Sequence, residues 1–165
     1  WALGVWEKPL NVEHWKVPAD EVHQAVADAF LRYDVWRLYA DPPYWESTIA
    51  AWAGQFGAER VIEWWTNRRR AMTAALQAFS TAILDGKVLH SDDPTMTRHI
   101  GNARREDLKG WRDEQGKPLW LIRKDRADSP HKIDAAMAAV LSWEARNDAI
   151  AAGMIQPVGV SFEWV

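Results

Sequence analysis

The 165-residue sequence contains no cysteine and no apolar run long enough to cross a membrane. The lack of cysteine excludes disulfides, thiolate zinc sites and cysteine nucleophiles, so any metal must be bound by oxygen or imidazole. The first residues, WALGVWEKP, have neither the basic region nor the continuous apolar region of a signal peptide. We therefore expect neither a membrane span nor a secretory leader.

The motifs of several enzyme classes are also missing. The sequence has no GxxxxGK[ST], GxGxxG or GxSxG segment, and its 5 histidines show no HExxH spacing. ATP binding by a P-loop is therefore excluded. Dinucleotide sites, hydrolase triads and zinc hydrolase sites have no support, and we expect the histidines to lie at the surface or to support other residues.

The composition of the chain indicates one globular domain. Apolar residues make up 48% of the chain and charged residues 26%, without repeats or a linker rich in Gly, Ser or Pro. Tryptophan is unusually frequent, with 12 residues, and such large rigid side chains are expected mainly in the core.

Charge is unevenly distributed along the chain. The net charge is −3, but residues 1–63 carry ten Asp or Glu against five Lys or Arg, whereas residues 98–126 carry nine Lys or Arg against five Asp or Glu. This second segment is a basic region where a polyanion could bind.

The spacing of apolar residues predicts helices that alternate with strands, which is typical of an α/β domain with helices covering the sheet. Asp93 and Ser129, each followed by proline, are expected to cap helices. The expected elements are an N-terminal strand or hairpin, helices at 18–33, 45–56, 72–83, 94–105 and 131–152, strands at 35–40, 60–65 and 119–124, an extended segment at 87–90 and a hairpin turn at 109–118.

Two aspartates are the main candidates for chemistry. Asp41 directly follows an expected strand, where open α/β sheets place their sites. Asp134 lies beside the Ile133, Met137 and Val140 face of the last helix, so we expect its carboxylate at the border of the buried side, opposite a cation. Two such carboxylates can bind Mg²⁺ or Mn²⁺. In the alternative interpretation, Asp41 caps a helix, and Asp134 is solvated near a helix N-terminus.

Basic residues gather in two places. Arg68, Arg69 and Arg70 open one helix, and further cations accumulate toward Asp134. A run of charge is usually a solvated face, but its position beside the candidate metal site favours contact with a phosphate backbone. The residues expected to contact DNA are Arg68, Arg69, Arg70, Arg98, Asn102, Arg104, Arg105 and Lys124.

Four segments carry a resemblance to a known family. They are VWRLYADPPYWES at 35–47, VIEWWTNRRRAM at 61–72, RHIGNA at 98–103 and, above all, PLWLIRKDRADSPHKIDAAMAAVLSWEAR at 118–146. Together they resemble the C-terminal nuclease domain of the terminase large subunit of tailed phages, in the form common among phages of actinobacteria.

This resemblance implies an RNase H-like mixed sheet flanked by helices and a two-metal endonuclease that cuts concatemeric viral DNA during packaging in the host cytoplasm. It implies that Asp41 and Asp134 match two of the family's three metal-binding acidic positions, holding two Mg²⁺ or Mn²⁺ ions. His131 and Lys132 are candidates for supporting these ligands or contacting phosphate. The implied partners are double-stranded DNA, an ATPase domain, the portal and the small terminase subunit.

The third acidic position of the family lies on the first strand, which has no counterpart in residues 1–165. That strand is normally central in the sheet, and its absence would leave unpaired backbone there. We therefore expect a single nuclease domain at 1–165 that is incomplete at its N-terminus, without the ATPase domain.

Two alternatives stay open. The first is another RNase H-like nuclease, such as a junction resolvase or a transposase, which a preference for branched over linear DNA would reveal. The second is a non-catalytic module that grips DNA or docks a motor, which would bind DNA equally well in EDTA.

Overall fold

A computed structural model describes residues 2–9, 11–126 and 128–155 of the chain. The protein is a mixed α/β structure, as the sequence predicts. In chain order its elements are α1 (Ala19–Arg32), β1 (Leu38–Ala40), α2 (Glu46–Phe56), β2 (Val61–Glu63), α3 (Arg69–Leu84), α4 (Pro94–Asn102), β3 (Arg104–Arg112), β4 (Pro118–Arg123) and α5 (Asp134–Ala151).

The first sheet is a parallel pair, β1 and β2, in which Leu38 lies opposite Val61 and Ala40 opposite Glu63. Because successive side chains of a strand point to opposite faces, Leu38 and Ala40 face one way and Tyr39 the other. The face with Leu38 and Ala40 is covered by α1 and α2, whose apolar stripes form one core with Val61. The contributing helix residues are Val22, Val26, Phe30, Ile49, Trp52 and Phe56.

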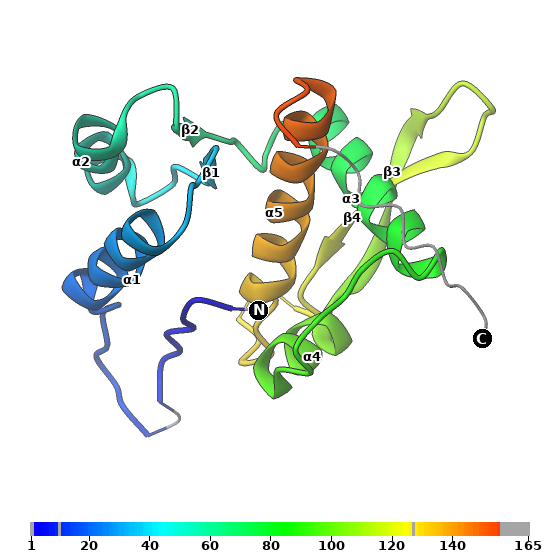
Figure 1. Cartoon of the computed structure of the whole chain (residues 1–165). Coiled ribbons are helices and arrows are strands. Elements are labelled where there is room, and N and C mark those ends of the chain that lie inside the picture. Colours follow the sequence, from blue (N-terminus) through cyan, green and yellow to red (C-terminus); the bar gives the residue numbers. More distant parts are fainter. Residues whose placement is uncertain (1, 10, 127, 156–165) are drawn as a thin grey trace, which may run out of the picture.

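Helix α5 lies against the other side of β1 and separates this part of the molecule from the remaining helices and strands (Figure 1). The Tyr39 hydroxyl donates a hydrogen bond of 2.5 Å to Asp148 near the end of α5. The backbone amide of Leu38 donates to Arg60, and that of Trp64 donates to the carbonyl of Ala40. In the described residues the opposite edge of β1 has no strand partner.

The second sheet is the antiparallel hairpin of β3 and β4, with Arg104 opposite Arg123 and an irregularity in register between Asp107 and Arg112. Its β4 strand packs on α3, and α3 packs on α5 (Figure 1). Around Met72, Leu76 and Val140 these elements form a second core, joined by side chains of Trp64, Phe79, Trp120, Leu121, Ile122 and Met137.

The start of α4 confirms one predicted cap, and the start of α5 contradicts another. Asp93 accepts a 2.8 Å hydrogen bond from the amide of Met96, with Pro94 as the first residue of the helix. In contrast, α5 begins at Asp134, and the side chain of its N-cap residue, Ile133, forms no hydrogen bond with the first backbone amides of the helix. Ser129 instead accepts a hydrogen bond of 3.0 Å from the amide of His131 in the preceding loop.

Two expectations about strands and helix ends are wrong. Residues 2–9 and 11–17 form no strand, because no described segment pairs with their backbones. The segment 87–90 lies outside any helix or strand. The helix expected at 94–105 ends at Asn102, where the long strand β3 begins. β3 is mostly polar and exposed on both faces, so its pairing with β4, rather than any apolar pattern, makes it a strand.

Tryptophan side chains are less buried than expected. Trp52 is buried, with its indole N–H donating to His23 at 3.0 Å, whereas the other described tryptophans are half-buried. Large aromatic residues often keep their polar edge near water in this way. Among the residues that the structure describes, no helix combines the length and the apolar character needed to cross a membrane.

Candidate metal and DNA site

Asp41 follows β1 directly and is half-buried. Its two carboxylate oxygens are both engaged by Thr66, which follows β2: the amide donates to Oδ1 at 3.1 Å and the hydroxyl donates to Oδ2 at 2.7 Å. Asp41 does not cap α2, because that helix has Trp45 as its N-cap residue. The alternative interpretation of Asp41 as a helix cap is therefore wrong, and the carboxylate is fixed at the carboxyl end of the parallel strand pair.

Asp134 is the first residue of α5 and is exposed. The expectation that it lies at the border of the buried side is wrong, because Ala135 and Ala136 turn toward the core and Asp134 faces solvent with Ala138. The alternative expectation, a solvated carboxylate at the helix N-terminus, is confirmed. Such a carboxylate is stabilised modestly by the helix dipole, and the structure gives it no hydrogen bond or ion pair with the described residues.

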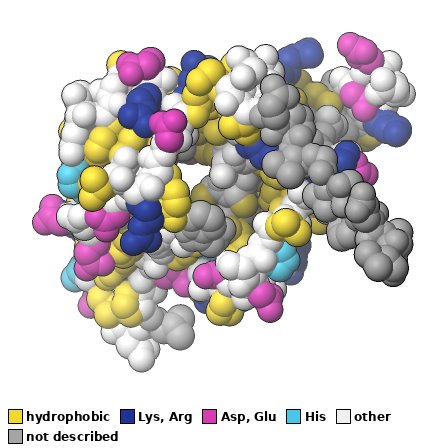
Figure 2. All heavy atoms as spheres, in the orientation of Figure 1, with side chains coloured by type: hydrophobic (Ala, Val, Ile, Leu, Met, Phe, Trp, Pro, Cys, Tyr) yellow, Lys and Arg dark blue, Asp and Glu magenta, His cyan; other side chains and the backbone are white. Residues whose placement is uncertain are grey.

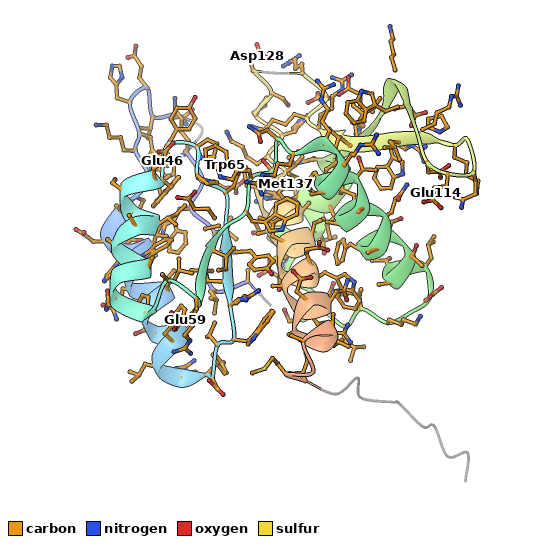
Figure 3. The ribbon with its side chains drawn as sticks, turned by 90° about the horizontal axis from the view of Figure 1, so that it is seen from above. Glu46, Glu59, Trp65, Glu114, Asp128 and Met137 are labelled. Atoms are coloured by element: carbon orange, nitrogen blue, oxygen red, sulfur yellow. The ribbon has the colours of Figure 1, made fainter. Side chains whose placement is uncertain are left out.

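The segment that follows β2 shares a hydrophobic cluster with the first half of α5. Trp64, at the end of β2, packs in the same cluster as Met137 and Val140 of α5. Figure 3 shows Trp65 and Met137 on the same side of the molecule. Neither Asp41 nor Asp134 belongs to this cluster, and no hydrogen bond of the described residues joins the two carboxylates, so their sharing of a metal ion stays a prediction.

The loop before α5 holds two further predicted residues. His131 is exposed, with Nδ1 3.5 Å from the Asp125 carboxylate. A hydrogen bond from Ser129, the largest effect, lowers the pKa of Asp125, and the nearby His131 charge adds to it. Lys132 is half-buried, and its carbonyl accepts a 2.9 Å hydrogen bond from Asn102. The supporting roles expected for His131 and Lys132 stay predictions.

The arginines at the start of α3 gather at the β3 strand. Arg69 and Arg70 are exposed, and their guanidinium groups lie 5.9 and 5.4 Å from the centre of the Trp111 ring. Arg68 is also exposed and precedes the helix. Stacking on an aromatic ring holds a guanidinium in place while leaving its N–H groups free to reach a phosphate.

Four of the other predicted DNA-contacting residues form hydrogen bonds within the protein. Arg98 pairs with Glu7 at 2.6 Å, and Asn102 binds the carbonyl of Lys132. Arg105 bonds Asp107 at 2.7 Å. Arg104 donates to the carbonyl of Gly101, and Lys124 is half-buried. On the face drawn in Figure 2, the described basic side chains are interspersed with acidic ones.

The donors available for a metal are few. In the described ranges, no three His, Asp or Glu side chains are grouped closely enough to hold a metal ion. The joint metal site of Asp41 and Asp134, and the third ligand expected outside residues 1–165, stay predictions.

Glu144 and Asp148 are two acidic residues in the second half of α5, away from Asp134. Glu144 is half-buried, and burial, reinforced by the nearby Asp148 charge, raises the pKa of Glu144. Burial and the hydrogen bond to Asp148 likewise raise the pKa of Tyr39. The hydrogen bond between Tyr39 and Asp148 joins β1 to α5, and none of these three residues was a candidate from the sequence.

Two residues at the site escaped sequence reasoning. Thr66 lies in the segment TNRRR, in which only the arginines were candidates for function. Its neighbouring residues do not indicate a hydrogen bond with Asp41. Glu7 lies in the N-terminal segment WALGVWEKP, whose pattern does not indicate that Glu7 pairs with both Arg98 and His99 of α4. Only contacts between segments far apart in sequence reveal these two residues.

Two curated proteins are similar in sequence. The chain is 30% identical over 142 residues to the Gene 13 protein of Mycobacterium phage D29, and 28% identical over 142 residues to the Gene 13 protein of Mycobacterium phage L5. Each match covers 81% of this chain but 23% of the relative, so the chain spans about a quarter of these relatives.

No family model matches the sequence. No solved structure matches the fold. The sequence relatives are bacteriophage proteins, and the chain shares this bacteriophage origin.

Proposed function

We propose that the chain is part of the nuclease domain of a tailed-phage terminase large subunit, with an RNase H-like fold, and that it takes part in metal-dependent cleavage of DNA. The observation that carries the proposal is the fixed carboxylate of Asp41 at the carboxyl end of a parallel strand pair. Open α/β sheets bind their ligands at that end. The bacteriophage origin of the relatives is in accord with this proposal.

The donor types suit Mg²⁺ or Mn²⁺, which prefer carboxylate oxygens. Each oxygen of Asp41 accepts one hydrogen bond from Thr66 and keeps a second lone pair for a ligand. Asp134 is exposed, and no other side chain in the described part of the chain bonds its carboxylate, which is therefore accessible. These two residues would hold the metal, together with a third carboxylate from an upstream strand.

When bound, such ions supply an activated water and stabilise the charge that develops on the scissile phosphate. The chain itself contributes orientation. Thr66 holds the Asp41 carboxylate against rotation, and the N-terminus of α5 favours a carboxylate at Asp134 and a phosphate nearby. Arg69 and Arg70, held over Trp111, offer cations to the DNA backbone.

The upstream strand would pair with the unpartnered edge of β1. Leu38 and Ala40 use their backbone groups to bind β2, so those of Tyr39, which alternate with them, point to that edge. An added strand there would bring a carboxylate beside Asp41. It would also widen a two-stranded pair, which is marginal on its own, into a larger sheet.

The test compares plasmid nicking by three proteins: residues 1–165, the same chain extended upstream through the expected strand, and the extended chain with Asp134→Asn. We expect little or no nicking by residues 1–165 and clear Mn²⁺- or Mg²⁺-dependent nicking by the extended chain. Asp134→Asn should abolish nicking while DNA binding stays nearly unchanged, because it removes a ligand without altering the basic residues.

Asp20→Asn is the matched control. Asp20 is also exposed and lies in the first turn of a helix, α1, so its loss removes the same favourable interaction with a helix dipole. Nicking should survive this change. Robust nicking by residues 1–165 would contradict the proposed ligand set. If the extended chain binds DNA equally well in EDTA and in Mn²⁺ but nicks it in neither, the result would favour a non-catalytic DNA-binding module. A preference for branched over linear DNA would favour a resolvase.

A further inference from the structure

His99 is nearly inaccessible to solvent, with 1% of its surface exposed, although it lies on a short helix whose other residues are mostly exposed. Both of its ring nitrogens have partners. Nδ1 accepts a hydrogen bond of 3.0 Å from the backbone amide of Ala135, and Nε2 lies 2.7 Å from the Glu7 carboxylate. The ring therefore connects three segments that are far apart in sequence.

The contact with Ala135 determines where the imidazole carries its proton. A backbone amide can only donate a hydrogen bond, so Nδ1 must be unprotonated. The neutral ring then has its proton on Nε2, which donates to Glu7. Glu7 thus holds the imidazole in the tautomer that Ala135 requires.

Ala135 is the second residue of α5, and its amide is one of the first four in the helix, which have no partner inside it. A side chain at the N-cap position usually satisfies one of these amides, but Ile133 cannot do so. His99 performs this capping function from α4. The residue directly before its target is Asp134.

Two other residues of α4 form hydrogen bonds with the same segments as His99. The Asn102 amide donates to the carbonyl of Lys132, two residues before α5 begins, at 2.9 Å. Arg98 pairs with the second oxygen of Glu7 at 2.6 Å. The segment RHIGN, at 98–102, therefore binds the entrance of α5 on one side and residue 7 on the other.

We propose that His99 is a positioning residue for the metal site: it caps the first turn of α5 from α4 and so sets the place of the Asp134 carboxylate. This inference rests on the proposed function, in which Asp134 holds a metal. Metal ligands must lie within a few tenths of an ångström of their required distance, and the partners that orient them strongly affect binding.

Two substitutions separate the two hydrogen bonds of the ring. His99→Asn keeps an oxygen near the place of Nδ1, which can accept from Ala135, and loses the group that reaches Glu7. His99→Gln keeps an N–H near the place of Nε2, which can donate to Glu7, and loses the acceptor for Ala135. Both variants replace the ring by an amide, so they leave similar empty space in the core.

In the extended chain that nicks DNA, His99→Asn should retain most of the nicking. His99→Gln should lose roughly 10- to 100-fold and need more Mn²⁺, the scale of effect known for groups that orient metal ligands. His90→Asn and His90→Gln serve as controls, because His90 is exposed and its Nδ1 accepts from the nearby Asp92 amide. Neither control should change the nicking rate.

Two measurements on residues 1–165 do not depend on nicking. Nitrogen NMR of the wild-type imidazole should show the proton on Nε2, and hydrogen exchange of the Ala135 amide should be slow in wild type and His99→Asn but fast in His99→Gln. A proton on Nδ1, or equal exchange in the two variants, would overturn the capping role.

The outcomes separate the two proposals. Equal loss of nicking in both His99 variants, without a change in the Mn²⁺ requirement, would mean that His99 only fills the core. If the extended wild-type chain does not nick DNA at all, the proposed function fails, and the exchange of the Ala135 amide still decides whether His99 caps α5.

Discussion

Asp41 and Thr66 form a closed pair in which both oxygens of the carboxylate are bound by one residue, through its amide and its hydroxyl. The pair joins the segments that follow two neighbouring parallel strands. It therefore fixes a carboxylate at the sheet end where α/β proteins bind ligands.

Replacing Thr66 by valine should destabilise the protein by about 1.5–3 kcal/mol, the usual range for a hydrogen bond to a charged group. Valine keeps the shape of the side chain but cannot donate to Asp41. Urea unfolding measures the loss, and metal-dependent nicking by the extended chain should fall with it. Thr66→Ser retains the hydroxyl and should recover most of both properties. A Thr66→Val protein with unchanged stability would show that the hydroxyl contributes nothing.

Tyr39 links β1 to α5 through its hydrogen bond to Asp148. Tyr39→Phe removes the donor and leaves a half-buried carboxylate with one partner fewer, so we expect a loss of about 1.5–3 kcal/mol in the free energy of unfolding. Tyr44→Phe is the control, since Tyr44 is 99% exposed and its hydroxyl is solvated. Thermal unfolding of the two variants side by side makes the comparison, and equal melting temperatures would contradict a role for this link.

Glu144 makes the stability of the protein depend on pH. Its pKa is raised in the folded state by burial and by Asp148, so the folded protein keeps this proton at pH values where the unfolded chain has released it. The stabilisation from this group is complete below its ordinary pKa of 4.5 and is lost as the pH rises through the higher pKa of the folded protein.

Glu144→Gln, which cannot ionise, should therefore be more stable than wild type at pH 7, with a smaller difference at pH 4. Urea midpoints at the two pH values measure this. The exposed Glu46, changed to Gln, provides the comparison and should show no gain, because a carboxylate in the first turn of α2 is favoured by the helix dipole. A Glu144→Gln protein less stable than wild type at pH 7 would mean that the charge of Glu144 is favourable.

DNA binding is predicted to be mainly electrostatic. The affinity for duplex DNA should fall steeply between about 50 and 200 mM salt, because bound cations release counterions from the phosphates. Arg70→Gln should weaken binding to all sequences alike and reduce the salt slope by about 1. Arg32→Gln, an exposed cation at the end of α1, should change neither quantity. Affinity that does not respond to salt would refute the basic-surface prediction.

The local sequence was sufficient to predict most helices and the strands that carry apolar residues. The stripe Trp45, Ile49, Trp52 and Phe56 gave α2, and Asp93 with Pro94 gave the start of α4, because helix periodicity and capping involve residues within one or two turns. The position of Asp41 after a strand was predicted in the same way.

Tertiary structure decided the rest. The strand β3 is polar on both faces and exists through its partner β4, and Asp134 faces solvent because Ala135 and Ala136 fill the space beside α3 and α4. Thr66 bonds Asp41, which lies 25 positions away in the sequence, and Glu7 bonds His99, which lies 92 positions away. Hydrogen bonds across such distances depend on how the packed elements meet, and no local pattern of residue types contains that information.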